Sequence, residues 1–551
     1  MQQTPFDKPS SATAFLTLLA GSLALSAMSG CAGTSPTLGA PQPQMNAPGL
    51  AARGGGSSPV RSVAAPKIDE KKIAPLQTVP TPDDLFTVLP YVQPGDAVPA
   101  PTAATPDSAT GIAAPASASA ALVWQTATDN KPEPAQWTVE QRTSGTDTWT
   151  RVSGTPAARN WAAPGAVSAR VWSVPLAGLV PGALFDYRVS KDNKPVFVGR
   201  ARAARPAGEN LRFVVFGDCA AGTAGQKKVA YQTSLAKPDF VFITGDIVYD
   251  RGRESEYLSR FFPIYNASTA DPAKGAPLLR STLFYAAPGN HDTAYRDLSK
   301  WPDGMAYFAE WRLPLNGPDV KPGVNAANAT GDEQAVKALT EASGSAFPRM
   351  ANYSFRQGDT YWLVLDSNPY VDWTAKELHD WVDKELAGAK DAKWRFVAFH
   401  HPPFHSSEEH ADDQQMRVLC DLFEKYKVDV VWSGHVHNYQ RSYPLHFTAK
   451  KADDGTLRDA KNRVAGDWKL DKAFDGTKNT KPDGVIYIVT GAGGANLYDA
   501  DKQNKPEAWL PFTAKYVAVH GLTLADVKGN KLSVRQIGED GSEQDHFTIT
   551  K

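Results

Sequence analysis

Short segments of alternating apolar and polar residues, separated by turn residues, occupy the chain between residues 84 and 205. They lie at 121–125, 137–140, 170–174 and 185–189. An alternation of period two turns every second side chain to one face of a strand, and short strands at this spacing are typical of a β-sandwich. The pattern therefore predicts an all-β domain over 84–205, with its aromatic residues in the core.

Longer apolar runs alternate with helical patterns after residue 205. The runs cover residues 211–216, 240–244, 283–287, 361–366, 395–399, 428–432 and 485–490. Two segments between them, 375–386 and 414–426, repeat apolar residues with helical spacing. Strands that are apolar throughout and alternate with helices indicate an α/β domain with a buried sheet, over residues 206–551.

Three segments show neither the period-two alternation nor the apolar runs with helical patterns between them. Residues 318–346 and 449–482 are long and polar, so we expect surface insertions there. Residues 32–83 are rich in Ala, Pro, Gly and Ser and poor in aromatic residues. Such a composition buries too little apolar surface to offset the entropy of ordering, which predicts a flexible linker.

The first 31 residues carry the pattern of an export signal. A leucine-rich apolar run at 16–25 leads into small residues before Cys31, and it is too short to cross a bilayer. Residues 27–31 resemble a bacterial lipobox, in which the cysteine is acylated. We therefore expect export to the periplasm or cell surface, with an outer-membrane lipid anchor on Cys31. Plain cleavage near Ala27, without lipid, is the alternative.

Composition and charge argue against nucleic-acid binding and against a disulfide framework. The 551 residues include 58 Lys+Arg and 59 Asp+Glu, a net charge of -1. So little net charge offers no global field for nucleic acid, and local charges must hold any anionic substrate. The three cysteines are too few for a disulfide framework, and we expect Cys219 and Cys420 to be small packed residues.

Five of the predicted strands in the α/β domain end in polar clusters. They read GD at 217–218, GDIVY at 245–249, GNHD at 289–292, HHPP at 400–403 and GHVH at 434–437. Singly, each has a structural explanation such as a turn or a helix cap. Ligands of open α/β sheets bind beyond the carboxyl ends of the strands, so together the clusters are expected to meet in one crevice.

Metal binding explains such a crevice. So many buried carboxylates and imidazoles would be costly without a cation, and these donors suit Zn, Mn or Fe. They outnumber the ligands of one tetrahedral site. The clusters therefore predict two metal ions that share a carboxylate, a layout suited to holding both oxygens of a phosphoryl transfer.

The ordered motifs GD, GDxxY, GNHD, HHPP and GHVHNYQR resemble the calcineurin-like metallophosphoesterases, and Tyr249, three residues after Asp246, is similar to the purple acid phosphatase branch. The similarity covers nearly all of residues 211–494. It implies a four-layer fold in which helices flank two mixed sheets. A fibronectin type III-like sandwich would precede this fold along the chain. Residues 176–182 with Tyr187 resemble the corner of such a module, whose tyrosine hydroxyl returns to the backbone.

The resemblance also implies a ligand set. A first metal, Fe(III), would be held by Asp218, Tyr249 and His437. A second, divalent metal (Zn, Fe or Mn) would be held by Asn290, His400 and His435, and Asp246 would bridge the two. His400 is assigned rather than His401 because the family ligand precedes an x-Pro pair. The first motif differs from this branch at Cys219-Ala220, where a glycine or a ligand histidine is usual. Because no histidine is present there, binding of the first metal depends more strongly on Tyr249.

The family mechanism assigns the remaining roles. A metal-bound hydroxide would attack phosphorus, while His291, oriented by Asp292, would hold the phosphate and assist the leaving oxygen. His410, ten residues after His400, is the expected substrate-facing histidine, and His405 is the competing choice.

The sequence thus predicts an exported dinuclear-metal phosphatase acting on small phosphomonoesters. A phosphodiesterase or nucleotidase on the same scaffold is the nearest alternative, and a catalytically inactive surface binding protein is a remote one. The pattern leaves the oligomeric state open.

Overall fold

The computed structural model of the protein describes residues 70–82, 84–96, 118–128, 136–166, 168–452 and 455–551. The predicted export signal, Cys31 and most of the predicted linker lie outside the described residues. No helix within the described ranges is long and apolar enough to cross a membrane. The described residues all belong to one compact unit.

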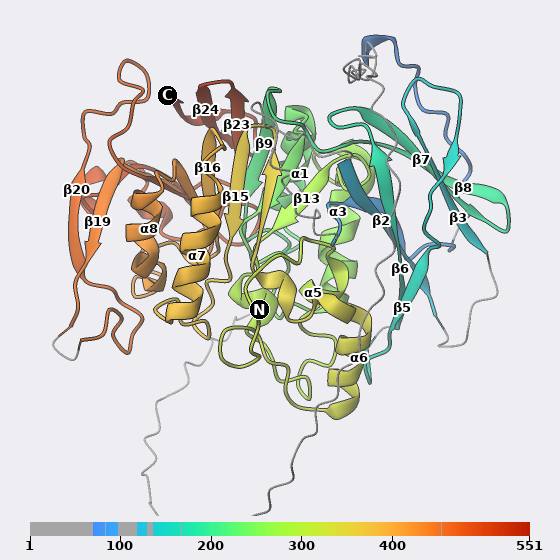
Figure 1. Ribbon diagram of the computed structural model, residues 1–551, viewed down its shortest axis with the longest axis horizontal. Helices are drawn as coiled ribbons and strands as arrows, with labels where there is room; N and C mark the ends of the chain where they lie inside the picture. The colour runs from blue at the N-terminus through green and yellow to red at the C-terminus, as the bar shows by residue number, and fades with distance from the viewer. Residues whose placement is uncertain (1–69, 83, 97–117, 129–135, 167, 453–454) are drawn as a thin grey trace, which may run out of the picture. The chain divides into compact units, whose positions relative to one another are not determined.

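Two four-stranded antiparallel sheets form the N-terminal part of this unit, drawn in blue and teal in Figure 1. The first, in spatial order, contains β1 (Val88–Gln93), β2 (Ala118–Ala127), β6 (Ala169–Leu179) and β5 (Ala157–Trp161). The second contains β4 (Thr150–Arg151), β3 (Trp137–Thr143), β7 (Leu184–Lys191) and β8 (Lys194–Arg202). The Trp137 ring of the second sheet lies 5.4 Å from Trp124 and 5.8 Å from Trp172 of the first. The predicted all-β sandwich is confirmed, whereas its fibronectin-like character and its boundaries stay predictions.

Two contacts of the sandwich differ from what the sequence suggests. Residues 70–82, at the end of the predicted linker, are bound to it: Thr81 donates to the Val196 carbonyl (3.0 Å) and Glu70 pairs with Arg202 (2.6 Å). The Tyr187 hydroxyl donates to the backbone carbonyl of Arg280 (2.9 Å), which lies in the α/β part. Tyr187 therefore joins the sandwich to its neighbour instead of closing a corner within it.

Two mixed sheets form the α/β part. The six-stranded sheet contains, in order, β13 (Leu283–Ala286), β10 (Phe240–Ile243), β9 (Leu211–Phe216), β23 (Gly521–Lys528), β24 (Lys531–Gly538) and β25 (Glu543–Thr550). The seven-stranded sheet contains β14 (Tyr353–Gln357), β15 (Thr360–Val364), β16 (Trp394–Ala398), β17 (Val430–Ser433), β21 (Ile486–Thr490), β18 (Tyr439–Ser442) and β22 (Thr513–Val517). Within each sheet the strands that carry the polar clusters are parallel to one another: β13, β10 and β9 in one sheet, β16 and β17 in the other.

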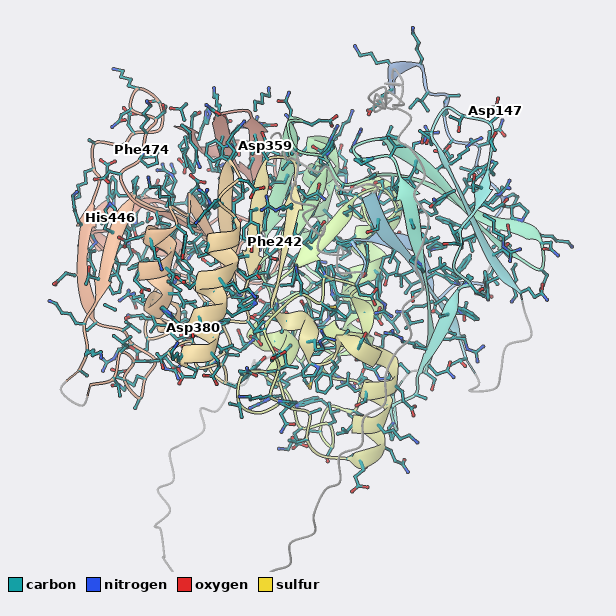
Figure 2. The ribbon with its side chains drawn as sticks, viewed as in Figure 1. Asp147, Phe242, Asp359, Asp380, His446 and Phe474 are labelled. Atoms are coloured by element: carbon teal, nitrogen blue, oxygen red, sulfur yellow. The ribbon has the colours of Figure 1, made fainter. Side chains whose placement is uncertain are left out.

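Large aromatic side chains fill the space between these two sheets. The Phe213 ring of β9 lies 5.2 Å from Trp362 of β15 and 5.9 Å from Trp432 of β17. Phe242 of β10, labelled in Figure 2, lies 5.2 Å from Trp362. All four are fully buried. β10, β15 and β17 are buried along their whole length because both faces of each sheet are covered there.

Helices cover the outer faces and complete the predicted four-layer α/β fold. α7 (Lys376–Gly388) lies on the seven-stranded sheet (Figure 1). It buries Leu378, Val382 and Leu386. On the six-stranded sheet, α1 (Ala224–Ala236) contacts β23 and buries Val229 and Ala230. The predicted helix at 414–426 is a 3₁₀ helix, Gln415–Leu419, followed by α8 (Cys420–Lys425).

Short elements complete the described part of the chain. The helices are α2 (Glu254–Glu256), α3 (Phe262–Tyr265), α4 (Asn290–Thr293) and α5 (Tyr307–Glu310), with a π-helical turn at Tyr257–Phe261. A small sheet pairs β11 (Asn266–Asp271) with β12 (Gly275–Pro277). The 3₁₀ turns are Glu70–Lys72, Gly344–Ala346, Arg349–Ala351, Ala500–Lys502 and Pro506–Ala508.

The two predicted surface insertions are partly core. Within 318–346, α6 (Glu333–Ser343) buries Leu339 together with several alanines, and Arg159 of β5 donates to the Ser343 carbonyl (2.8 Å). Alanines supply most of this buried face. Within 449–482, β20 (Gly466–Leu470) pairs with β19 (Leu445–Ala449), and Phe474, labelled in Figure 2, is buried and packs on Phe547.

Candidate metal centre

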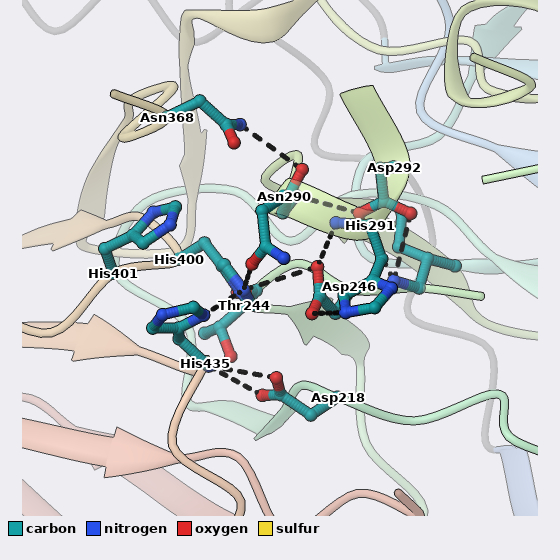
Figure 3. Close-up of polar contacts among 12 residues, drawn as sticks. Asp218, Thr244, Asp246, Asn290, His291, Asp292, Asn368, His400, His401 and His435 are labelled. Atoms are coloured by element: carbon teal, nitrogen blue, oxygen red, sulfur yellow. Dashed lines mark hydrogen bonds and ion pairs between the residues drawn. The ribbon is translucent and has the colours of Figure 1, made fainter. Parts of the chain in front are cut away.

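The polar clusters that follow five strands meet at one place (Figure 3). Backbone hydrogen bonds join the segments that carry them: Asp218 N–H donates to the Gly245 carbonyl (3.0 Å) and Gly434 N–H to the His400 carbonyl (2.9 Å). The structure brings together all seven predicted ligands, which are Asp218, Asp246, Tyr249, Asn290, His400, His435 and His437. Parallel strand ends, contributed by both sheets, thus build a single site.

The first group of donors surrounds one oxygen of Asp246. Its Oδ1 lies 3.3 Å from His400 Nε2. The same nitrogen is 3.0 Å from Asn290 Oδ1 and 3.1 Å from His435 Nδ1. One possible ligand atom from each of Asp246, His400 and His435 lies within 4.8 Å of the other two.

The second group surrounds the other oxygen of Asp246. The Tyr249 hydroxyl oxygen lies 3.2 Å from Asp246 Oδ2, 3.2 Å from Asp218 Oδ1 and 3.0 Å from His437 Nε2. Asp218, Asp246 and His437 likewise place ligand atoms within 4.8 Å of one another. The two oxygens of Asp246 therefore face two separate groups, as a carboxylate that bridges two metal ions would.

The backbone is bent sharply where three of these side chains leave it. Asp218, Asp246 and His435 have φ of 56°, 49° and 68°. Side-chain-bearing residues rarely adopt this left-handed conformation, and residues that do so gather at functional sites.

Glycines give the ligands room. A Cβ on Gly289 would lie 2.1 Å from Asp246 Oδ1, and one on Gly434 would lie 2.6 Å from Asp218 Oδ2. A Cβ atom essentially never comes within 3.0 Å of a non-bonded heavy atom, so close approach requires the glycine in each motif.

Each candidate histidine ligand turns its other ring nitrogen to an oxygen. His400 Nδ1 lies 2.8 Å from the Thr244 carbonyl, and His437 Nδ1 lies 2.6 Å from the Asn496 carbonyl. His435 Nε2 lies 3.0 Å from Asp413 Oδ2. Such partners fix the ring and direct the remaining nitrogen toward the centre, the usual arrangement of histidines that bind metal.

The ionisable side chains of the centre shift one another's pKa values. Burial opposes ionisation of Asp246, but His400 and His291 hold its pKa well below the usual value. Burial also opposes the charge on His400, yet Asp246 raises its pKa to about 9. Burial, and then the charge of His400, hold the pKa of His435 well below its usual value. A metal ion needs neutral imidazole, so binding one here would displace the His400 proton. Two carboxylates, three imidazoles, an amide and a phenol suit Fe or Zn.

His291 lies beside the bridging carboxylate, with its Nε2 3.8 Å from Asp246 Oδ2. Its Nδ1 lies 2.7 Å from the Asp250 carbonyl. Asp292, expected to orient this ring, instead accepts from the backbone N–H groups of Gly289 (2.8 Å) and Ile247 (3.1 Å). Burial, together with Asp246, raises the pKa of Asp292 to about 7. Asp292 thus holds the turn that carries His291, and the Asp250 carbonyl sets the ring.

The two histidines considered for contact with substrate lie at different depths. The ring centre of His410 is 3.8 Å from that of His435, and 32% of its side chain is exposed. His405 is buried beneath it, with Nε2 3.2 Å from the His410 carbonyl, and burial lowers its pKa to about 4. His401 is buried and bonds to Ser367 Oγ (2.9 Å). Of these three, His410 is the one that can reach a bound substrate.

Sequence reasoning missed Asp413 and Tyr498. Tyr498 stacks on His437 with ring centres 4.0 Å apart. Asp413 lies three residues after His410, a spacing too common to single out, and no motif marks Tyr498. Cys219 is fully buried, and burial raises the pKa of its thiol, so it is a packed residue as predicted.

Comparison with known families decides what this site belongs to. The sequence profile of the family called calcineurin-like phosphoesterase matches residues 211–439, the stretch that contains all seven predicted ligands. This region is a calcineurin-like phosphoesterase domain. The phosphoesterase domain thus contains every strand end from which the centre is built.

Three known proteins resemble parts of this chain. An uncharacterized protein of Mycobacterium tuberculosis is 26% identical over 347 residues, 59% of this chain and 58% of its own length. A nucleotide pyrophosphatase/phosphodiesterase of Hordeum vulgare is 26% identical over 329 residues, 54% of this chain and 72% of its own. An Fe(3+)-Zn(2+) purple acid phosphatase of Arabidopsis thaliana is 38% identical over 108 residues, 18% of this chain and 22% of its own.

A solved structure shares the fold. The purple acid phosphatase from yellow lupin seeds superposes with a TM-score of 0.53 at 17% identity, over 84% of this chain and 74% of that one. The resemblance to the purple acid phosphatase branch is confirmed. The chain spans 58% of the length of its mycobacterial relative.

Proposed function

We propose that the protein is a dinuclear-metal phosphatase that hydrolyses small phosphomonoesters. The observation that carries the proposal is the position of Asp246, whose Oδ1 lies 3.3 Å from His400 Nε2 and whose Oδ2 lies 3.2 Å from the Tyr249 hydroxyl. Two metal ions held by these groups would activate water and neutralise the charge of the phosphoryl group.

The donor sets suggest which ion each group takes. A phenol beside Asp218 and His437 suits Fe(III), and the amide and imidazoles of Asn290, His400 and His435 suit a divalent ion such as Zn, Fe or Mn. The Arabidopsis relative carries an Fe(3+)-Zn(2+) pair in its name, which supports this assignment.

His291 and His410 would handle the substrate. Because the Asp250 carbonyl holds His291 Nδ1, the Nε2 of this ring faces the centre and can donate to a phosphate oxygen, then give its proton to the leaving oxygen. His410, on the side of His435, would bind the substrate from the opposite direction.

The test is hydrolysis of an aryl phosphomonoester and of the matching diester by purified protein that starts after Cys31. We expect the Asp246→Asn variant to lose monoester turnover by about a hundredfold or more and to bind fewer than two metal ions, measured by elemental analysis. Asp372→Asn, at an exposed site, is the matched control. If metal-loaded protein cleaves neither ester, the proposed phosphatase function is wrong and the catalytically inactive binding protein is favoured.

A diesterase is the second candidate, because the barley relative is named a nucleotide pyrophosphatase/phosphodiesterase. Two metal ions activate water equally for either ester. Diester turnover above monoester turnover in the same assay would replace the first proposal by this one.

We also propose export and lipid anchoring through Cys31, on the strength of the pattern at 1–31. The Cys31→Ser protein should be released from membranes by washing, while the unchanged protein is retained. Equal retention of both would contradict the anchor.

A further inference from the structure

A wall of aromatic and cationic side chains adjoins the His291 side of the centre. It consists of Arg251, Tyr295 and Trp301, here called the Arg251 wall. The guanidinium carbon of Arg251 lies 4.4 Å from the ring centre of Tyr295 and 5.3 Å from that of Trp301. The Tyr295 ring centre is 5.7 Å from that of His291. All three side chains are partly exposed, so the wall forms a surface that leads outward from His291.

Arg251 has no carboxylate partner for its side chain within the described part of the chain. Its neighbour Arg253 is paired with Asp303 at 2.6 Å. The loop also carries Asp250, Glu254 and Glu256, and no ion pair joins any of them to Arg251 within the described residues. The Glu256 carboxylate accepts from the backbone N–H groups of residues 250, 251 and 253. The guanidinium of Arg251 is therefore a cation that remains available to an anionic ligand.

One backbone carbonyl links this cation to His291. The Asp250 oxygen accepts from Arg251 Nη1 at 2.8 Å and lies 2.7 Å from His291 Nδ1. The opposite nitrogen of the same ring, Nε2, faces Asp246. Arg251 is thus connected to the bridging carboxylate through one carbonyl group and one imidazole ring.

We propose that Arg251 is a specificity-determining residue that binds a second phosphate group of the substrate, beside the phosphoryl group at the centre. The inference rests on the proposed function and names its substrate class, phosphate esters that carry a diphosphate. A guanidinium held against two aromatic rings loses little freedom on binding, and its planar fork matches two phosphate oxygens.

The test compares ADP with AMP, which differ by one phosphate and share their base and ribose. We expect Arg251→Gln to lower kcat/KM for ADP about tenfold, mainly through KM, and to change kcat/KM for AMP less than about twofold. Arg188→Gln is the matched control, because Arg188 stacks 4.5 Å from Trp149 in the sandwich. Equal losses on both nucleotides, or no loss on either, would overturn the proposal.

Binding measurements keep this inference separate from the proposed function. Calorimetric titration of the metal-loaded protein with inorganic pyrophosphate and with phosphate, followed by metal analysis, needs no turnover. If the unchanged protein hydrolyses neither nucleotide, the proposed function fails, yet weaker binding of pyrophosphate alone by Arg251→Gln still supports the anion site. Unchanged pyrophosphate affinity overturns it.

A carboxylate could supply the second negative charge in place of a phosphate. The pair 3-phosphoglycerate and glycerol 3-phosphate tests this source. If Arg251→Gln reduces the preference within this pair more than the preference for ADP over AMP, the assignment to a diphosphate is wrong.

Discussion

His435 shows how a single side chain is held ready for metal. Its left-handed backbone, with φ of 68°, lets its N–H donate to both oxygens of Asp218 (3.0 and 2.9 Å). Its Nε2 lies 3.0 Å from Asp413, and its Nδ1 faces His400 and Asp246. The motif GHVH predicts that a histidine is present here. Asp413, which decides which ring nitrogen faces the centre, is supplied by a different loop.

At this scale we predict that Asp413→Asn weakens metal binding. An amide holds the His435 ring less firmly than a carboxylate and makes its Nδ1 a weaker metal ligand. We therefore expect metal affinity to fall about tenfold to a hundredfold. Competition with a chelator, read by elemental analysis, measures it. Asp412→Asn, at the exposed neighbouring position, is the control and should keep its metal. Equal affinities in the two variants would contradict the role of Asp413.

At the scale of elements, the apolar runs and the strands agree closely, while α6 was not predicted. The run at 240–244, for example, is β10 (Phe240–Ile243), because a strand buried on both faces leaves a continuous apolar signal. The apolar face of α6 consists mainly of Ala335, Ala338 and Ala342 around Leu339. That face depends on contact with β5, a strand far away in the sequence.

We predict that Leu339→Ala destabilises the protein by about 2–4 kcal/mol, because the side chain is fully buried and its loss leaves a cavity. Unfolding in urea measures the change. Lys337→Ala, on the exposed face of the same helix, should change the free energy of unfolding by less than about 0.5 kcal/mol. If both substitutions have equally small effects, α6 is a surface insertion after all.

At the scale of the whole molecule, the sandwich and the phosphoesterase domain share buried polar contacts. Gln125 donates to Glu310 Oε2 (2.7 Å), and Gln93 donates to the Glu310 carbonyl (2.9 Å). Glu254 is buried beside Glu310. Burial, and then the charge of Glu310, raise the pKa of Glu254 well above its usual value of 4.5. One proton is therefore held at the boundary between the two parts.

This proton makes stability depend on pH. Above about pH 4.5 the unfolded chain releases the Glu254 proton while the folded protein keeps it, so stability falls as pH rises toward the raised pKa. Glu254→Gln carries no such proton, so we expect it to lose less stability than the unchanged protein between about pH 5 and pH 8. Urea unfolding at both pH values measures this difference. Glu341→Gln, at an exposed site, should follow the unchanged protein. A Glu254→Gln protein with the same pH dependence would show that Glu254 is ionised when folded.

The sequence by itself determined the elements and the chemistry that local patterns record. Period-two alternation and apolar runs give the strands, and the glycine-containing motifs after five strands give seven predicted ligands, because each depends on residues adjacent in the chain. The tertiary structure alone decided which side chains from different loops meet. Asp413 behind His435, Tyr498 on His437 and Arg251 beside His291 are such cases. It also decided that an alanine-rich helix and a buried carboxyl pair belong to the core, because burial depends on what packs against a residue.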